Sequence, residues 1–172
     1  MPPLFCTIST SALYAPSDGY AFIASSSAFV CAEEGINEKG LAVGMTYVWG
    51  KQLKAGLSSM FLVRYILEKC TTVKEGINAI LNNPIGGAYH LILADNNEIA
   101  HAECSPRRIK VHQGDWAIAS NHFVSDEMKE YETDKNLYNS HQRYNKALVC
   151  LEQHRHLSSL QQGCFDLLRP LA

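Results

Sequence analysis

The 172-residue sequence lacks a pronounced charge of either sign, because 15 Lys and Arg residues oppose 17 Asp and Glu residues and leave a formal net charge of −2. Its basic residues are scattered and form no stripe. A nucleic-acid partner is usually bound by such a stripe, so we predict that the chain binds no nucleic acid. No uncharged run is long and apolar enough to cross a bilayer, so we also predict no membrane partner.

Residues 1–17 carry no charge, but they lack the basic region and the sustained apolar core of a signal peptide. The sequence also lacks a C-x-x-C pair. Its cysteines are Cys6, Cys31, Cys70, Cys104, Cys150 and Cys164. Their wide spacing in mostly apolar surroundings favours reduced, buried thiols in a cytoplasmic protein over a disulfide framework. The histidines lack the paired spacing of a metal site, and we predict neither a metal ion nor a cofactor.

The sequence does contain a run from Gly35 to Val48 that divides into a polar turn and an apolar strand. Gly40 closes the turn Asn37–Gly40, and glycine adopts the positive φ that such a turn needs at no steric cost. The β-branched and aromatic residues that follow are typical of a buried strand. We expect this strand to be central.

Apolar residues alternate in several other segments and recur every three to four residues in others, which predicts strands and helices respectively. The candidate strands are Phe5–Ser11, Tyr20–Ile23, Phe29–Ala32, Leu41–Trp49, His90–Ala94, Ile99–Cys104, Ile109–His112 and Trp116–Ala119. The candidate helices are 58–70, 72–82, 135–151 and 158–168, the second starting with a capping box of Thr72 and Glu75. This order predicts an α+β fold of antiparallel sheets with flanking helices, in one domain of residues 1–172.

Three side chains are suited to catalysis. Asn121 and His122 directly follow the candidate strand Trp116–Ala119, where an amide could stabilise an oxyanion and an imidazole could transfer protons. The same pair is also typical of a turn. Cys6 lies near the amino terminus and could act as a thiol nucleophile, or be a buried structural cysteine.

Glu103 lies on the otherwise apolar strand Ile99–Cys104 and therefore needs a partner if it is buried. We expect a structural ion pair with a guanidinium group. The candidates are Arg107, Arg108 and Arg143.

Several motifs, in this order along the chain, resemble the linear-amide C–N hydrolases, which include the choloylglycine hydrolases and the acyl-coenzyme A:6-aminopenicillanic acid acyltransferase-like proteins. They are Glu34–Thr46, the two helices after it, Ala102–Pro106, Ala119–Phe123 and Asn139–Tyr144, and the resemblance covers about residues 5–150. It implies the αββα sandwich of the N-terminal nucleophile hydrolases. It also implies a cysteine nucleophile at residue one of the mature chain, with its own α-amine as base. By resemblance, Asn121 stabilises the oxyanion and Arg143 is an active-site arginine.

The sequence departs from this family in its first third. Thr46 and Tyr47 stand where the choloylglycine branch has a second Asn, so we assign them, with His122, to substrate binding. The Gly-Arg-Asn-x-Asp type of segment that should follow the nucleophile is absent. Cys6 is internal and too near Gly35 to leave room for the strands that this segment builds. The chain therefore resembles the carboxy-terminal portion of the family, after its nucleophile.

Two functions follow as expectations. One is a cysteine-dependent hydrolase or acyltransferase acting on a small-molecule linear amide or acyl substrate, with the nucleophile segment missing. The alternative is a non-catalytic remnant or small-molecule binding module of the same fold. A sheet without its first strands has unpaired edge groups, so we expect a homo-oligomer or a partner chain to cover that edge.

Overall fold

The computed structural model describes residues 9–27, 30–133 and 135–154. Cys6, the candidate helix 158–168 and most of the candidate strand Phe5–Ser11 lie outside these residues. The strands are β1 (Thr10–Tyr14), β2 (Phe22–Ser26), β3 (Glu34–Asn37), β4 (Ala42–Tyr47), β5 (Tyr89–Ala94), β6 (Ile99–Cys104) and β7 (Ile109–Gly114). The helices are α2 (Ser59–Lys69), α3 (Val73–Leu81), α4 (Asp126–Lys129) and α5 (Ser140–His154), with a 3-10 turn η1 (Leu137–Asn139) before α5.

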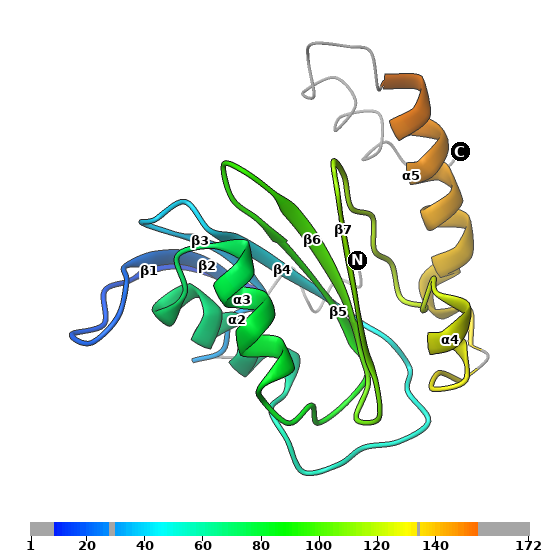
Figure 1. Ribbon diagram of the computed structural model, residues 1–172, viewed down its shortest axis with the longest axis horizontal. Coiled ribbons are helices and arrows are strands. Elements are labelled where there is room, and N and C mark those ends of the chain that lie inside the picture. The colour runs from blue at the N-terminus through cyan, green and yellow to red at the C-terminus, as the bar shows by residue number, and fades with distance from the viewer. Residues whose placement is uncertain (1–8, 28–29, 134, 155–172) are drawn as a thin grey trace.

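The strands form one seven-stranded sheet in chain order, and every neighbouring pair is antiparallel. Helices α2 and α3, inserted between β4 and β5, lie against one face of this sheet, and α5 stands apart beyond β7 (Figure 1). The predicted α+β class with antiparallel strands and flanking helices is confirmed. The predicted central strand is also confirmed, because β4 is the fourth of the seven.

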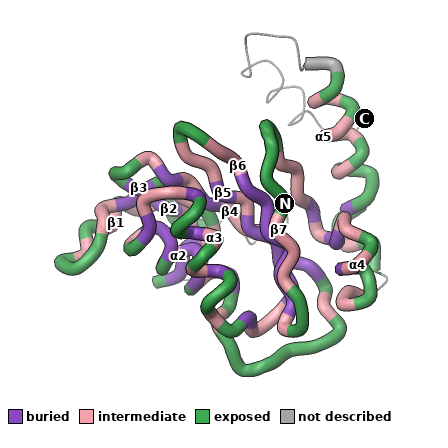
Figure 2. The backbone as a smooth tube through the Cα atoms, in the orientation of Figure 1, coloured by how far each residue is buried: buried purple, intermediate pink, exposed green. Residues whose placement is uncertain are grey.

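The core lies between the sheet and the two helices. Helix α2 forms because its apolar residues recur at helical spacing, and Leu62, Val63, Ile66 and Leu67 are fully buried against the sheet. Strand residues at every second position, such as Leu91 and Leu93, complete the core from β5. Figure 2 shows the buried residues gathered on α2 and on the strands beside it.

Two local devices fix the position of α2 and α3. Asn37 accepts hydrogen bonds from Leu41 N and Lys39 N at 3.1 Å each, and donates to the carbonyls of Leu67 and Cys70 at the end of α2. Gly40 has the expected positive φ of 85°. The predicted cap of α3 is confirmed, since the Thr72 hydroxyl accepts from Glu75 N at 3.2 Å. The Glu75 carboxylate reaches back to the amide and hydroxyl of Thr71, and these bonds, with the backbone amide of Thr72, lower the pKa of Glu75.

Two predicted strands are wrong. Trp116–Ala119 is not a strand and pairs with no strand of the described sheet. A four-residue apolar run forms a strand only where a neighbouring strand can accept and donate its backbone hydrogen bonds. In Phe29–Ala32 the described residues Val30–Ala32 are not a strand either. Cys31 and Ala32 are buried in the loop between β2 and β3, which accounts for the apolar run without a strand. Ala32 N donates to the carbonyl of Met60 in α2. The strand of this region is β3, a few residues later.

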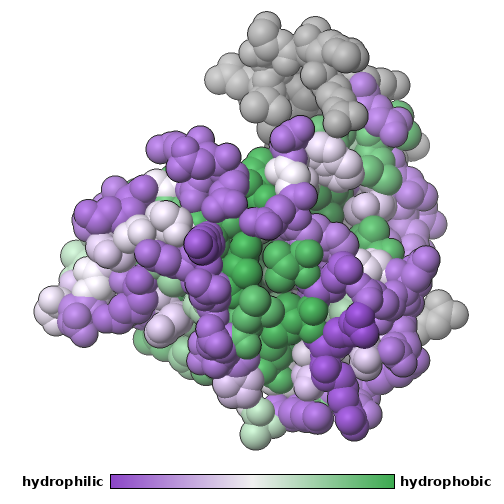
Figure 3. Space-filling view, in the orientation of Figure 1, coloured by the Kyte–Doolittle hydropathy of each residue, from purple (hydrophilic) through white to green (hydrophobic). Residues whose placement is uncertain are grey.

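The helices leave parts of the sheet open. Figure 3 shows hydrophobic surface between α3 and β7, consistent with the partial exposure of Ile109 and Val111 on β7. The opposite face is open over the first strands, where Leu13, Ile23 and Ile36 pair in one row and are 72%, 56% and 49% exposed. A trough of about 500 Å³ crosses this open face between β2 and β5.

Candidate functional site

The end of β4 meets a loop that lies far away in the sequence. Asn121, in the loop between β7 and α4, donates from Nδ2 to Thr46 Oγ1 at 2.9 Å and to the backbone carbonyl of Tyr47 at 2.7 Å. Both hydrogens of the Asn121 amide therefore have acceptors on β4. No described residue accepts the hydrogen of the Thr46 hydroxyl, which remains able to donate to a ligand.

Arg143 joins this contact from the first turns of α5. Its guanidinium donates to Asn121 Oδ1 at 2.5 Å and to the carbonyl of Tyr138 at 2.9 Å. Tyr138 and Asn139 have φ of 53° and 55°, an uncommon conformation for residues other than glycine, and they turn the chain into α5. Since Arg143 binds the oxygen of the Asn121 amide, the nitrogen of that amide must face Thr46.

Of the six residues that the sequence singled out, four therefore meet in one cluster, namely Thr46, Tyr47, Asn121 and Arg143. Cys6 lies outside the described residues. His122 is placed differently, because its side chain is buried against the start of α5, where its Nδ1 lies 2.6 Å from Ser140 Oγ. Burial, together with the nearby His141, lowers the pKa of His122 to about 4, so the ring is neutral near pH 7.

The expected ion pair of Glu103 is not formed. Arg107 bonds to Gln52, Arg108 to Glu127 and Arg143 to Asn121. The fully buried Glu103 carboxylate instead accepts from the backbone amides of Val124 and Ser125, at 2.5 Å and 3.1 Å. Burial raises the pKa of Glu103, but the hydrogen bonds from Ser125 and Val124, with His90 and His112 nearby, bring it below its ordinary value.

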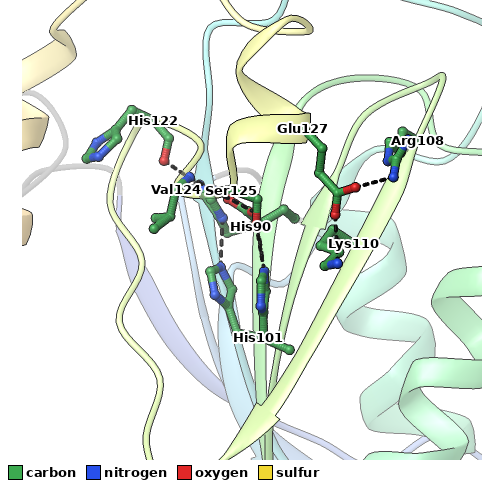
Figure 4. A network of polar contacts seen from close by, with 10 residues as sticks. His90, His101, Arg108, Lys110, His122, Val124, Ser125 and Glu127 are labelled. Carbon is green, nitrogen blue, oxygen red and sulfur yellow. Dashed lines mark hydrogen bonds and ion pairs between the residues drawn. The ribbon is translucent and has the colours of Figure 1, made fainter.

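A second buried polar side chain, that of His90, lies beside Glu103 on the neighbouring strand. His90 Nε2 donates to the carbonyl of His122 at 2.9 Å, and its Nδ1 lies 2.8 Å from His101 Nε2 (Figure 4). Burial, together with His101, lowers the pKa of His90 to about 3, and burial lowers that of His101 to about 4. The available signal was the two-residue alternation along each strand, which sets His101 and Glu103 on one face of β6 and His90 on the same side of β5, away from α2 and α3.

The cluster at the end of β4 consists of hydrogen-bond donors, which can bind a carbonyl oxygen or an anion. Burial raises the pKa of Cys70 to about 11 and raises that of Cys104 further, so both thiols stay protonated. Among the residues that the structure describes, no group of three His, Cys, Asp or Glu could hold a metal ion, and no helix could span a membrane.

The fold is found in several amide hydrolases of known structure. A variant of conjugated bile acid hydrolase from Clostridium perfringens is 14% identical with a TM-score of 0.64, over 87% of this chain and 62% of that chain. An N-acylethanolamine-hydrolyzing acid amidase ortholog from Caenorhabditis elegans is 13% identical with a TM-score of 0.66, over 98% and 76%. Penicillin V acylase from Agrobacterium tumefaciens is 20% identical with a TM-score of 0.49, over 88% and 47%.

These likenesses establish an N-terminal nucleophile hydrolase fold, and the chain spans less than two thirds of the bile acid hydrolase. No curated protein matches the sequence at a significant level. The sequence does match the profile of one family over residues 7–165, which confirms and slightly extends the resemblance seen in its motifs. The chain therefore belongs to the acyl-coenzyme A:6-aminopenicillanic acid acyl-transferase family.

Proposed function

We propose that the chain carries the oxyanion-binding side of an amide hydrolase or acyltransferase of the N-terminal nucleophile type. The observation that carries this proposal is the contact of Asn121 with Thr46 and Arg143 at the end of β4. Membership of the family and the fold of the amide hydrolases support it. In such a reaction a nucleophile attacks the amide carbon, and the carbonyl oxygen gains the charge that hydrogen-bond donors must stabilise.

The contacts of Asn121 suggest how an oxyanion is bound. The Thr46 hydroxyl accepts a hydrogen from Asn121 and donates its own to the substrate carbonyl oxygen. The Asn121 amide supplies a second donor when its hydrogen bond to the Tyr47 carbonyl is exchanged for one to the substrate. Arg143 stays on the oxygen side of the amide, so the amide nitrogen keeps facing the reaction. The Thr46 hydroxyl is held in place before the charge develops, which is what makes such a donor effective.

We propose Cys6 as the nucleophile if this chain is active by itself. Its thiol would need cleavage of the chain directly before it, so that the new α-amine, with a pKa of about 8, can serve as base. The alternative source is another polypeptide that supplies the nucleophile. We also propose a reducing, cytoplasmic location, because Cys31, Cys70 and Cys104 are buried free thiols in the described part of the chain.

The substrate that we propose is a small amide with an apolar acyl group. Tyr47 and Trp49 lie edge to face at 6.1 Å and are 45% and 41% exposed, so they offer aromatic surface directly beside Asn121. Bile-acid conjugates, N-acylethanolamines and penicillin V, on which the structural relatives act according to their names, share this chemistry. They form the natural panel of test compounds.

Product formation from this panel tests the proposal. Asn121→Ala should lower turnover by about 100-fold or more, the usual effect of losing one oxyanion donor, and Cys6→Ala should abolish it. Asn96→Ala, in the turn between β5 and β6, is the matched control and should leave turnover unchanged. Intact-mass measurement should show a chain that begins at Cys6. Unchanged turnover in Asn121→Ala, measured per folded molecule, would contradict the assignment of Asn121.

A second candidate function is binding without catalysis. It is favoured by one observation: both hydrogens and the oxygen of the Asn121 amide have partners within the chain, which suits a stable binding surface. In that case members of the panel should raise the melting temperature while no product forms. Equal stabilisation of the wild type and of Arg143→Ala would exclude this cluster as the binding site.

A further inference from the structure

A row of four polar side chains crosses strands β4 to β7 on the face opposite α2 and α3. Thr46 stands beside His90, His90 beside Glu103, and Glu103 beside Lys110, each pair in direct register on adjacent strands. Their neighbours in sequence, such as Leu91 and Ala102, point to the helix side and belong to the apolar core. The row is therefore a continuous polar line on a sheet whose other face is apolar.

The segment Asn121–Glu127 crosses this row and contacts its members in the same order. Each contact joins one member of the row to the next part of the segment, as Figure 4 shows from His90 onward. The contacts are Asn121 with Thr46 (2.9 Å), the His122 carbonyl with His90 (2.9 Å), the amides of Val124 and Ser125 with Glu103 (2.5 and 3.1 Å), and Glu127 with Lys110 (2.7 Å).

The two middle members of the row are buried, whereas its ends are accessible. His90 and Glu103 are 0% exposed. Residues 121–125 have no strand or helix of their own, so side chains must satisfy their backbone groups. A buried carbonyl or amide that loses its partner is costly, and a hydrogen bond to a charged group such as Glu103 is stronger than a neutral one.

The protonation of the buried pair follows from its contacts. A carbonyl can only accept, so His90 carries its hydrogen on Nε2 and points it at the carbonyl of His122. The unprotonated Nδ1 of His90 then accepts from Nε2–H of His101 at 2.8 Å. Glu103 accepts from two amides and from His112 Nε2 at 3.3 Å, so it serves as a carboxylate. The donor Nε2 of His90 and the acceptor carboxylate of Glu103 therefore lie on adjacent strands beneath the segment Asn121–Glu127.

We propose that His90 and Glu103 are positioning residues that set Asn121 against Thr46, and hence fix the oxyanion-binding geometry. The inference deepens the proposed function and rests on it for its catalytic meaning. His90 holds the residue directly after Asn121, and Glu103 holds the backbone two residues further on. The two contacts fix the direction in which the backbone leaves Asn121, while Arg143 fixes the plane of its amide.

The test measures the Asn121 side chain itself by nuclear magnetic resonance of the full, unliganded chain. Hydrogen exchange is followed for the Asn121 side-chain amide and for the backbone amides of Val124 and Ser125. Glu103→Leu and His90→Phe should each speed exchange at the Asn121 amide by at least about tenfold, since a buried contact is lost beneath it. Glu103→Gln, which keeps an acceptor oxygen, should retain most of the protection.

Ile80→Ala, a deletion in the helix-side core, is the control for general destabilisation. It should lower the melting temperature without a selective change at Asn121. If Glu103→Leu and His90→Phe change exchange at Asn121 no more than Ile80→Ala does, at equal global stability, the inference is wrong. If Glu103→Leu does not fold, the inference is judged by exchange at the Asn121 amide in the other two variants. It should be faster in His90→Phe and nearly unchanged in Glu103→Gln, and no difference between them would contradict the inference.

This measurement needs no turnover, so the two proposals fail separately. Suppose that Glu103→Leu and His90→Phe speed exchange at the Asn121 amide, while Asn121→Ala leaves catalysis unchanged. The positioning role of His90 and Glu103 would then be upheld, and the catalytic role of Asn121 would be refuted. In an active preparation Glu103→Leu should lower kcat more than it raises KM, and Glu103→Gln should recover much of the rate. A loss that Glu103→Gln does not recover at all would oppose a role through hydrogen bonding to the segment.

Discussion

At the scale of single residues, the candidate site depends on histidines that stay neutral. His122 lies in the loop that carries Asn121, His90 contacts that loop, and His101 contacts His90. Each has a pKa below its ordinary value because it is buried. The titratable and charged groups facing them are Glu103, His112, Lys129, His141 and Arg143. An unfolded chain takes up protons on these histidines near pH 6.5, whereas the folded chain resists until about pH 4.

We therefore expect the protein to lose stability in mild acid. Below pH 6.5 the unfolded state binds more protons than the folded state, so the free energy of unfolding falls as pH falls through this window. Each such histidine contributes a slope of up to about 1.4 kcal/mol per pH unit. Urea unfolding between pH 7 and 4.5 measures this slope, and His101→Gln should reduce it by about one proton. The same slope in both proteins would show that His101 is not involved.

The sequence predicted some of these residue-scale features and missed others. Thr46, Tyr47, Asn121 and Arg143 could be selected because each lies in or beside a motif of the family, and the structure places them together. The partners of Glu103 could not be predicted in the same way. They are backbone amides of a loop about 20 residues away, and backbone amides carry no signature in the sequence.

At the scale of elements, close approaches between strands and helices decide which small residues matter. Gly35 on β3 is such a point, because a Cβ there would lie 2.5 Å from the carbonyl oxygen of Ile23 and 2.9 Å from Leu67 in α2. Gly44, on the neighbouring strand, has only an ordinary contact at 3.7 Å. The two glycines look alike in the sequence but differ in their surroundings.

We expect Gly35→Ala to lower the free energy of unfolding by roughly 1–3 kcal/mol, since a backbone carbonyl must move to admit the methyl group. Gly44→Ala is the matched control and should change stability by much less. Chemical denaturation of the two variants beside the wild type measures the difference. Equal losses would mean that the sheet and α2 are not packed as closely at Gly35 as the structure has them.

The cap of α3 provides a prediction of its own. Thr72→Ala should cost about 1 kcal/mol, because Glu75 N loses its acceptor at the start of the helix. Thr72→Ser keeps the hydroxyl and should retain most of the stability. Thermal unfolding of the three proteins checks this, and a Thr72→Ser variant as unstable as Thr72→Ala would argue against the cap.

Elements with strong local periodicity could be predicted from the sequence, since helices α2 and α3 and the strands β5 and β6 follow from patterns within a dozen residues. The predicted strand after β7, Trp116–Ala119, was wrong because local composition does not decide strand pairing. Trp116–Ala119 has the composition of a strand, but the formation of a ladder depends on what lies beside it in space. Its residues instead lead the chain towards the loop that carries Asn121.

At the scale of the whole molecule, the open face over β1 to β3 is the feature that a solution experiment can address. Leu13, Ile23 and Ile36 expose a row of aliphatic side chains there, and β1 is an edge of the described sheet. Such a face is a typical site of association. We expect the purified chain to form an oligomer or to require a partner, as the sequence predicted.

Light scattering after size exclusion tests this expectation. Ile36→Lys should shift an oligomer towards the monomer, because a charge is then placed in the centre of the aliphatic row. Leu53→Lys, at an exposed loop residue outside this row, is the matched control and should leave the mass unchanged. A wild-type chain that is monomeric at all concentrations and binds no apolar dye would contradict the prediction.

The chain-order arrangement of the sheet has a consequence for how the molecule is made. Every strand pairs with the strand synthesised just before it, so the sheet can grow one strand at a time while the chain emerges. All members of the polar row, namely Thr46, His90, Glu103 and Lys110, precede residue 121 in the chain. The candidate site can therefore be completed only after all seven strands of the sheet have been made, and a chain interrupted after Gly114 would lack Asn121 and Arg143 altogether.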